Sequence, residues 1–476
     1  MICPPYALSR PDRYCRLLPP FVHPGDPERV DSRLRDLAET MFASRTIEKM
    51  VIPAPREGNP AAAYTYFGQF IMHDLTFDDT PFRSAGAQEP EETTNLRTPR
   101  LDLDSMYGDG PFSRAHQHLY DGIKFRIGQA TNHNKQPFDV PILRGFPALV
   151  DERNCENVIL RQIHAMFLLF HNVVVARFAG STGDKWQLFE KAQKIVRWHF
   201  QWLVRTDFLD KVCDPIVYDS IIAHGQRVTH WPPGRFSIPV EFSQAAARFG
   251  HSMVRSEYQL KENGDDIELG SLFGGVRRPV ALDDTKAVEW AHFVNPRQAA
   301  AEAINTSLVS PFRDLPDDAI DAFVSSPIPH EPHMLAVRTL CRGASTRLPT
   351  GQQLRVALDP KATIRTDHTA WANARAYGFG DETPLWYYLL LEAEIEGEAG
   401  EHLGKIGSRI VAEVIDAALH HDSGSFLHEA GGEWKPLTWP EINHRTIEDL
   451  SDLAAVVELE RYSKPRVEPS TDSPSP

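Results

Sequence analysis

Residues 152–178 read ERNCENVILRQIHAMFLLFHNVVVARF, and this stretch decides the fold class. Its apolar side chains recur at spacings of three and four, which is typical of one face of a helix. They are Ile159, Ile163, Phe167, Phe170 and Val174. The same spacing covers further segments, at roughly 31–47, 61–75, 186–211, 240–256, 383–398, 402–420 and 447–462. Alternating strand patterns are scarce, SIPV at 237–240 being among the few, so the sequence predicts a mainly α fold.

The length of 476 residues allows two or three domains, or one large domain. The apolar share of 42% and the charged share of 24% are near the averages of globular proteins. Residues 31–463 contain no repeat and no long linker, which predicts one large helical domain with little β structure. Residues 1–30 are rich in proline and predict an extended arm, and residues 464–476 have the composition of a disordered tail.

The charge balance argues against a nucleic-acid partner. Lys and Arg number 50 against 65 Asp and Glu, a formal net charge of −15, and no basic run accompanies it. The N-terminal sequence MICPPYALSRPDRYCRLLPPF lacks the apolar core of a signal peptide. No window reaches the ~18 apolar residues of a membrane span. We therefore expect no membrane span and a cytoplasmic location; the oligomeric state stays open.

The five cysteines are Cys3, Cys15, Cys155, Cys213 and Cys341. They are odd in number and widely spaced, without the CxxC pairs of a zinc or redox motif. This pattern predicts free thiols in a reducing compartment.

Polar side chains interrupt the apolar stretch YTYFGQFIMHDLTFDDT at 64–80. On a helix there, Gln69 and His73 are four apart and share a face, whereas Asp74 points about 100° away. One interpretation is a cavity that receives Gln69 and His73, and the other is a core histidine with satisfied hydrogen bonds. A His-Asp pair also occurs in metal-dependent phosphohydrolases, but their remaining ligands cannot be assigned in this chain.

A second polar stretch, TPRLDLDSMYGDGP at 98–111, alternates oxygen-bearing side chains with apolar ones. Thr98, Asp102 and Asp104 on an extended loop suit a hard cation such as calcium, and Asp74 could complete the shell. The alternative is a solvated acidic loop before a turn.

Two further stretches carry charged or histidine side chains at helical positions. Arg153 and Glu156 are three apart at the start of the long apolar helix, where acidic residues also serve as caps. In QAAARFGHSMVRSEYQL at 244–260, His251 follows a glycine, which would let a flat group approach the backbone. Core packing is the alternative explanation for His251.

Five stretches resemble, in order, the animal-type haem peroxidases of the peroxidase-cyclooxygenase superfamily. They are GQFIMHDLTF at 68–77, TPRLDLDSMYG at 98–108, DERNCENVILRQIHAMFLLFHN at 151–172, AARFGHSMV at 246–254 and LAVRTLCRGASTRLPTGQQL at 335–354. Five ordered motifs are far more specific than any one of them. The resemblance implies a single large helical haem-peroxidase domain.

The resemblance also implies roles for individual residues. His73 would be the distal histidine, Gln69 the distal glutamine and Arg153 the distal arginine. His251 would be the proximal histidine on the iron of haem b, with Arg248 beside it. The implied activity reduces hydrogen peroxide at the expense of a small organic or halide donor, through a ferryl intermediate. In it, His73 moves the peroxide proton and Arg153 stabilises developing negative charge.

A calcium site is implied as well. Its ligands would be Asp74, Thr98, the backbone carbonyl of Arg100, Asp102 and Asp104. Relatives often have Ser where this chain has Asp104, and the added charge should strengthen calcium binding. A role in the response to oxidative stress, or in oxidising a secondary metabolite, stays open.

Three positions depart from the family pattern on the haem side. Met72 stands where mammalian members have an ester-forming Asp, whereas Glu156 matches their other ester-forming carboxylate. Asn157 replaces the Met of a sulfonium link, so we expect haem held covalently once, through Glu156, or not at all. Thr339 stands where relatives have an Asn that accepts a hydrogen bond from the proximal histidine. Its hydroxyl could accept the same bond, but it is shorter by about one heavy atom.

Two other functions remain as alternatives. Fatty-acid dioxygenases of the superfamily use a Tyr three residues before the proximal histidine, and that position is Arg248 here. A non-catalytic haem-binding protein would explain Thr339. It would not explain why Gln69, His73 and Arg153 are all present.

Overall fold

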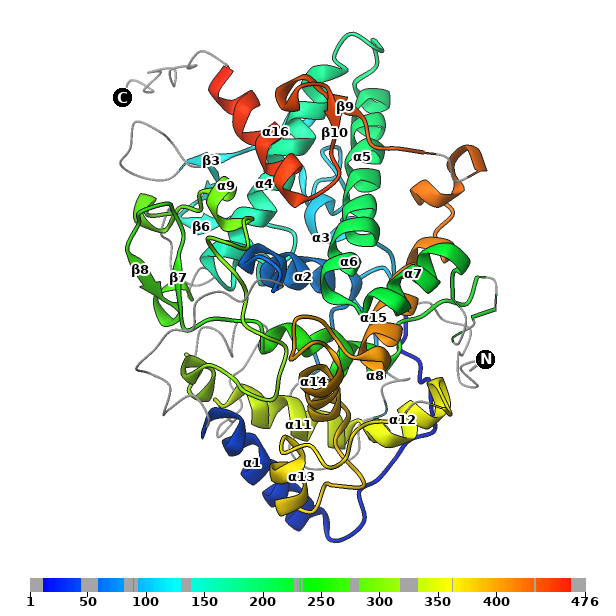
Figure 1. Cartoon of the computed structure of the whole chain (residues 1–476). Helices are drawn as coiled ribbons and strands as arrows, with labels where there is room; N and C mark the ends of the chain where they lie inside the picture. Colours follow the sequence, from blue (N-terminus) through cyan, green and yellow to red (C-terminus); the bar gives the residue numbers. More distant parts are fainter. Residues whose placement is uncertain are drawn as a thin grey trace.

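The structure is a computed structural model. It describes residues 12–43, 59–80, 89, 93–129, 138–226, 229, 231–232, 234–273, 282–316, 333–361, 363–431 and 434–463. Its architecture is mainly α-helical, and the strands of the described part are short antiparallel pairs (Figure 1). The predicted fold class is therefore confirmed.

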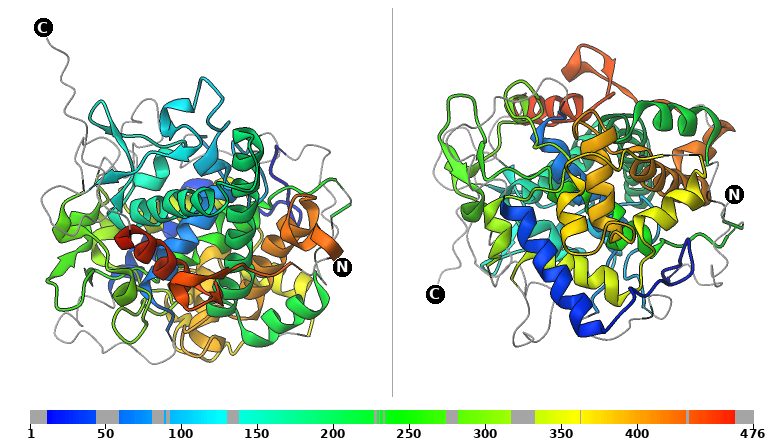
Figure 2. Two further views of the ribbon diagram at one scale, coloured as in Figure 1. Left: turned by 90° about the horizontal axis from the view of Figure 1, so that it is seen from above. Right: turned by 60° about the horizontal axis from the view of Figure 1, so that its bottom comes forward.

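The central helix is α4 (Val158–Arg177), which is buried on almost every side. It packs against α2 (Ala62–Leu75), α5 (Lys185–Trp202) and α16 (Leu450–Ser463). Seen from above, α4 and α5 lie over α2 (Figure 2). The length and composition of α4 would allow it to cross a membrane, because an 18-residue part of it has a mean hydropathy of 1.6. However, 83% of that part is buried inside the protein. That burial is what a core helix requires.

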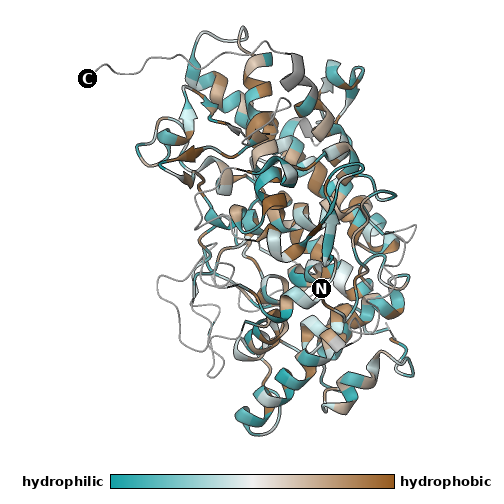
Figure 3. Ribbon diagram, turned by 90° about the vertical axis from the view of Figure 1, so that its left-hand side faces the viewer, coloured by the Kyte–Doolittle hydropathy of each residue, from teal (hydrophilic) through white to brown (hydrophobic). Residues whose placement is uncertain are grey.

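A second group of helices forms the lower half in Figure 1. There α1 (Pro27–Ala43) packs on α11 (Leu335–Ser345), and α14 (Leu385–Glu396) packs on both α11 and α15 (Lys405–His421). The helical ribbons alternate between apolar and polar patches (Figure 3), as expected of helices that turn one side to a core. The remaining α-helices of the described residues are α3 (Asp104–Tyr107), α6 (Leu209–Val212), α7 (Pro215–His224), α8 (Val240–Gln244), α9 (Trp290–Phe293), α12 (Gly351–Leu358) and α13 (Trp371–Ala376).

The strands make five two-stranded antiparallel sheets in the described residues. The pairs are β1 (Tyr120–Asp121) with β2 (Lys124–Phe125), β3 (Gly128–Gln129) with β4 (Phe138–Asp139), β5 (Ile142–Leu143) with β6 (Phe146–Pro147), β7 (Glu257–Gln259) with β8 (Asp266–Glu268), and β9 (Thr438–Trp439) with β10 (Arg445–Thr446).

Two predicted elements are wrong in detail, both near residue 240. SIPV at 237–240 is no strand, because Pro239 forms only a single bridge with Cys15 and Val240 already begins α8. The predicted helix over 240–256 breaks at Ala245, whose φ of −135° and ψ of −68° leave the helical region. The chain continues as a 3₁₀ helix, η5 (Ala246–His251). The other predicted helices exist in the described residues. The one predicted over 186–211 is α5, followed by a π-helix at Leu203–Phe208 and by α6, and the end of the one predicted over 31–47 lies outside the described residues.

Helix α4 does not begin at residue 152 as the periodicity suggests. A short 3₁₀ helix, η3 (Glu152–Cys155), precedes it, capped by the Asp151 carboxylate. Asn157 then caps α4 by accepting a hydrogen bond from the backbone N–H of Leu160 at 2.8 Å. This break turns the side chains of η3 away from the α4 stripe and toward α2.

Part of the predicted N-terminal arm crosses α8. The backbone N–H of Leu17 donates to the buried Glu241 carboxylate at 3.0 Å. Residues 1–11 and the predicted tail at 464–476 lie outside the described residues. Of the cysteines, Cys3 lies outside them too; Cys15, Cys155, Cys213 and Cys341 are buried free thiols, as predicted.

Candidate active site

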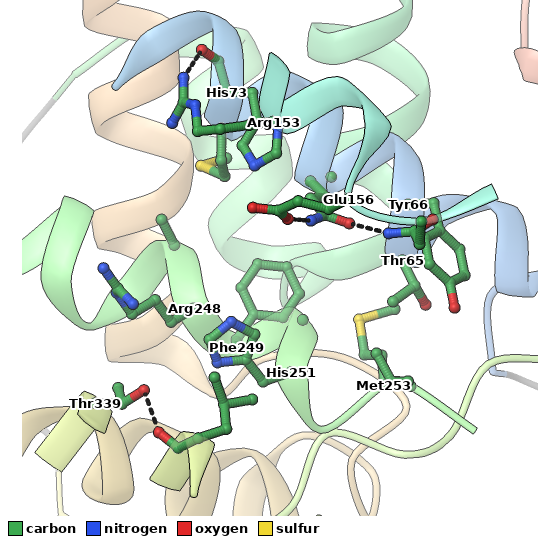
Figure 4. A pocket seen from close by; sticks show the side chains of 18 of the residues that line it. Thr65, Tyr66, His73, Arg153, Glu156, Arg248, Phe249, His251, Met253 and Thr339 are labelled. Atoms are coloured by element: carbon green, nitrogen blue, oxygen red, sulfur yellow. Dashed lines mark hydrogen bonds between the residues drawn. The ribbon is translucent and has the colours of Figure 1, made fainter. Parts of the chain in front are cut away.

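A cavity of about 410 Å³ lies between α2 and η3 on one side and η5 and α11 on the other. His73 and Arg153 enter it from the first side and His251 and Arg248 from the second (Figure 4). Gln69, Glu156 and Thr339 also line it. The structure thus brings together in one cavity side chains that the sequence separates by up to 270 residues.

His73 sits near the end of α2 and is 9% exposed. Its ring Nδ1 lies 3.0 Å from the side-chain oxygen of Asn154 on η3. Burial, and next the positive charge of Arg153, lower the pKa of His73 to about 3. The imidazole is therefore neutral at physiological pH and able to accept a proton.

Arg153 is held on several sides at once. It donates from Nε and Nη2 to the Asp151 carboxylate, at 3.0 and 2.8 Å. It also donates to the backbone carbonyls of His73 and Thr76, at 2.8 and 2.7 Å. Its guanidinium stacks over the ring of Phe77, 4.1 Å from the centroid. These contacts fix a positive charge beside His73.

Gln69 is engaged with the carboxylate that the sequence relates to an ester link. Its Nε2 donates to Glu156 at 2.7 Å, and its Oε1 accepts from Asn157 at 3.2 Å. Burial raises the pKa of Glu156 to about 7, which the Arg153 charge only partly offsets. Glu156 lines the cavity and is available there either as an acid or as a carboxylate. Met72 lines the same cavity and has no group that forms an ester.

His251 is the last residue of η5 and faces His73 across the cavity. Its Nδ1 is buried and has no hydrogen-bond partner among the described residues. Burial, followed by the Arg248 charge, lowers the pKa of His251 to about 3. A neutral imidazole that lines a cavity can offer iron the lone pair of Nε2 while Nδ1 carries the proton.

Thr339 does not bond to His251. Its hydroxyl donates instead to the backbone carbonyl of Leu335, one turn earlier on α11, at 3.0 Å. A Thr in a helix commonly makes this bond, because its short side chain reaches its own backbone more easily than a neighbour. The hydrogen bond that the family resemblance implies, donated by the proximal histidine to the residue at this position, is therefore absent in the structure.

Three arginines line the cavity on the η5 and α11 side: Arg248, Arg338 and Arg342. Arg248 donates to Ser243 O and Gln244 Oε1, at 3.2 and 3.0 Å. Burial, and then repulsion from Arg342, lower the pKa of Arg248 to about 10. The Asp78 carboxylate balances Arg342 at 2.9 Å. Together these arginines outnumber the acidic side chains of Asp78 and Asp79 in the cavity lining and give this edge a net positive charge.

The loop predicted to bind calcium brings its carboxylates together. Ligand oxygens of Asp74, Asp102 and Asp104 lie within 4.8 Å of one another. Leu103 adopts a φ of 57°, a turn that lets its neighbours on both sides face Asp74. The carboxylates raise one another's pKa in addition to the larger effect of burial, and that of Asp104 reaches about 6.

The remaining predicted ligands lie on the same loop. Thr98 donates its hydroxyl to Asp102 at 2.8 Å. The side chain of Arg100 points outward, 53% exposed, toward Asp422 at 3.9 Å. Arg97 lies 3.6 Å from Asp104 and partly balances the charge of that carboxylate.

The sequence reasoning missed several residues around the cavity. Asn154 bonds to both His73 and His164, and Asp78 pairs with Arg342. A histidine on the buried, mostly apolar α4 was the available signal for His164. Asn154 and Asp78 gave no such signal, because each acts through a partner distant in sequence.

The residues present suit a haem group and a calcium ion. For haem, a neutral, unpartnered His251 offers iron a ligand, and the cationic edge suits the two carboxylates of haem b. For calcium, three carboxylates converge, and Asp104 Oδ1 is buried without a hydrogen-bond partner among the described residues.

Comparisons with known proteins bear on the family and the fold. The family model described as animal haem peroxidase matches residues 78–326, which begins after His73 and ends before Thr339. Among solved structures, peroxidase A of Dictyostelium discoideum is 16% identical, with a TM-score of 0.59 over 88% of this chain and 89% of that one.

Two plant fatty acid alpha-dioxygenases share the fold to a similar degree. That of Oryza sativa is 14% identical, with a TM-score of 0.62 over 94% of this chain and 82% of its own. That of Arabidopsis thaliana is also 14% identical, with a TM-score of 0.60 over 96% and 78%. No curated protein sequence matches the chain. At these identities the structural likeness concerns the fold alone.

Proposed function

Because the chain belongs to the animal haem peroxidase family, we propose that it is a haem-dependent peroxidase that reduces hydrogen peroxide. The electrons would come from a small organic or halide donor. The observation that carries this proposal is the pairing of neutral His73 with the fixed Arg153 charge, facing the unpartnered His251 across one cavity.

The chain's own residues divide the work of holding haem. His251 would supply the axial nitrogen to the iron. Arg248, Arg338 and Arg342 would bind the haem carboxylates at the cationic edge. Bound haem supplies the redox-active iron that exchanges electrons with peroxide and donor.

On the opposite side, His73 and Arg153 would act on the peroxide. His73 accepts a proton from hydrogen peroxide and returns it to the departing oxygen, which leaves as water. Arg153 stabilises the negative charge that develops as the O–O bond breaks. Its pairing with Asp151 keeps the guanidinium in place, so no rearrangement is needed when the charge appears.

Two finer features belong to the proposal. Calcium would bind Asp74, Thr98, the Arg100 carbonyl, Asp102 and Asp104, on the loop that follows α2. Haem would be linked covalently once, through Glu156, or not at all. The 2.7 Å bond from Gln69 occupies one oxygen of that carboxylate and leaves the other available, so it is compatible with both arrangements.

Rapid mixing tests the proposal. Haem-loaded protein is mixed with one equivalent of hydrogen peroxide and followed through its Soret band, and a phenolic donor is then added. We expect a shifted band that returns when the donor arrives. His73→Ala should bind haem with a normal Soret band but fail to react. If the Soret band of the unsubstituted protein does not change in peroxide, or only loses intensity, the result would instead favour a non-catalytic haem protein.

Fatty-acid oxygenation is a second candidate function. The observation that favours it is that two tyrosines, Tyr64 and Tyr66, line the cavity. Arg248 occupies the position from which the superfamily's dioxygenases supply their tyrosyl radical, which argues against that route. Oxygen uptake with a polyunsaturated fatty acid and haem-loaded protein distinguishes the two functions. The peroxidase proposal expects no uptake above that of His73→Ala.

A further inference from the structure

A three-membered hydrogen-bonded chain runs from the cavity into the core of α4. His73 Nδ1 lies 3.0 Å from Asn154 Oδ1, and Asn154 Nδ2 lies 3.1 Å from His164 Nδ1. Asn154 is fully buried and His164 is 1% exposed. The chain is therefore shielded from water, which would otherwise exchange with its bonds.

The chemistry of the amide assigns the protons along this chain. The Asn154 oxygen can only accept, so His73 must carry its proton on Nδ1. The Asn154 nitrogen can only donate, so His164 Nδ1 must be the unprotonated nitrogen of its ring. His73 then has its free lone pair on Nε2, the nitrogen that remains for the cavity.

The surroundings hold the backbone of Asn154 and the rings on either side of its amide. Its backbone N–H donates to Asp151 O at 3.1 Å within η3. The next residue toward the N-terminus, Arg153, bonds to the backbone carbonyl of His73 at 2.8 Å. His164 is held in turn by the ring of Phe70, packed edge-on at a centroid distance of 5.9 Å. Two successive residues of η3 thus bind His73: Arg153 bonds to its backbone carbonyl and Asn154 to its ring.

We propose that Asn154 and His164 are positioning residues that hold His73 in the tautomer with a proton on Nδ1 and a free lone pair on Nε2. The inference rests on the proposed function of His73 as the group that takes the peroxide proton. The opposite tautomer would present an N–H to the cavity and could accept nothing there. Arg153 and Asn154 therefore have separate tasks: one supplies charge and the other selects the tautomer.

No proton travels along the chain in this proposal. Nε2 gains the peroxide proton while Nδ1 keeps its own, and the Asn154 oxygen stabilises the imidazolium by the same bond. When Nε2 returns the proton to the departing oxygen, His73 regains its starting tautomer. Each turnover thus begins and ends with the same arrangement of protons.

The test is nitrogen NMR of histidine side chains, which distinguishes protonated from unprotonated ring nitrogens. The sample is the full chain, ¹⁵N-labelled at histidine and loaded with zinc protoporphyrin as a diamagnetic stand-in for haem. The His73 signals are assigned by their loss in His73→Gln. We expect Nδ1 protonated and Nε2 unprotonated in the unsubstituted protein. The reverse pattern overturns the proposal without any variant having to fold.

Substitutions then test the two positioning residues separately. In Asn154→Leu, and in His164→Leu, the preference of His73 for one tautomer should be lost. Asn154→Asp retains an acceptor for Nδ1–H, so His73 should keep its tautomer while His164 acquires a proton on Nδ1. Unchanged His73 populations in both leucine variants would contradict the inference.

His171→Leu is the matched control. His171 is equally buried on the same helix, but bonds to Tyr107 and to the Ile123 carbonyl, away from the cavity. The haem-loaded variants at Asn154 and His164 should lose about 10- to 100-fold in the rate of reaction with peroxide, as is common for groups that orient a reactive residue. The His171 variant should lose little. An unsubstituted protein with the expected tautomer but no reaction with peroxide would refute the proposed function and leave the tautomer assignment standing.

Discussion

Arg153 donates from Nη2 to the backbone carbonyl of His73 at 2.8 Å, so the charge that assists the reaction is bonded to the residue that moves the proton. The same nitrogen donates to Asp151, also at 2.8 Å. Asp151 therefore controls the placement of both residues from outside the cavity.

Asp151→Asn should both destabilise the protein and slow its reaction with peroxide. Asp151 is 2% exposed and binds Arg97 as well as Arg153, which keeps the pKa of its carboxyl well below the usual range. Removing one partner of a buried ion pair costs about 3 to 5 kcal/mol of unfolding free energy. Urea denaturation measures that loss, and stopped-flow mixing measures the rate.

Asp184→Asn is the control for that variant. Asp184 caps α5 on an exposed surface by accepting from Trp186 N at 2.8 Å, as Asp151 caps η3 by accepting from Arg153 N. Because Asn caps a helix about as well as Asp, the Asp184 change should cost less than about 0.5 kcal/mol. Equal losses at the two positions would mean that capping, and not the ion pair, explains the role of Asp151.

Glu156 should make stability fall as pH rises. Burial raises its pKa to about 7 from a usual 4.5, so between these values the folded state holds a proton that the unfolded chain has lost. The stabilisation is complete below pH 4.5 and is lost as pH rises through 7. At the upper end of this pH range, the ionisation of Glu156 lowers the free energy of unfolding by as much as about 3 kcal/mol.

Glu156→Gln isolates this effect from that of other buried acids. The denaturation midpoint of the variant should fall less than that of the unsubstituted protein between pH 4.5 and 8. Glu152→Gln, an exposed position on the same η3, should behave like the unsubstituted protein. Parallel curves for all three proteins would show that Glu156 titrates normally, and so is not desolvated.

The motifs predicted the members of the cavity better than the bonds between them. His73, Arg153 and His251 could be named because their types and spacings are local features of the sequence. The hydrogen bond of Thr339 could not be predicted, because its hydroxyl could bond either to His251 or to the Leu335 carbonyl. Only the geometry of α11 determines which of the two bonds forms.

The same limit applied to the backbone. Small, apolar residues at 245–251 continue a helical pattern, yet the chain forms a 3₁₀ turn there that delivers His251 to the cavity. The periodicity of apolar residues shows which side of a helix is buried. Over one or two turns this pattern is nearly the same for a 3₁₀ helix, with three residues per turn, and for an α-helix, with 3.6. Packing against α14, which the pattern does not contain, accompanies the tighter turn.

Thr339→Asn should lower the reduction potential of the haem-loaded protein. His251 Nδ1 is buried and unpartnered among the described residues, and Asn would bring an acceptor oxygen on a longer side chain to the same cavity. A hydrogen bond from Nδ1–H makes the imidazole a stronger donor, which favours ferric over ferrous iron. Spectroelectrochemical titration measures the shift.

Thr339→Val keeps the shape of the side chain and removes only the bond to the Leu335 carbonyl. Its potential should match that of the unsubstituted protein. An unchanged potential in Thr339→Asn would mean that the residue does not influence the proximal side, and would leave the departure from the family pattern without a functional effect.

Calcium should bind the acidic loop, and Asp104 should contribute strongly to its affinity. Ligand oxygens of Asp74, Asp102 and Asp104 lie within 4.8 Å of one another, and bringing a cation among them relieves their mutual repulsion. Replacing Asp104 by Ser, the residue that relatives often have, removes one negative charge. We expect calorimetric titration to show at least about a tenfold loss of affinity.

Because the pKa of Asp104 is about 6, affinity in the unsubstituted protein should also fall as pH drops through that value. Asp109→Asn, five residues further along and 70% exposed in its side chain, should bind calcium as before. A calcium affinity that is the same in Asp104→Ser and in Asp109→Asn would mean that the loop is a solvated acidic turn and not a cation site.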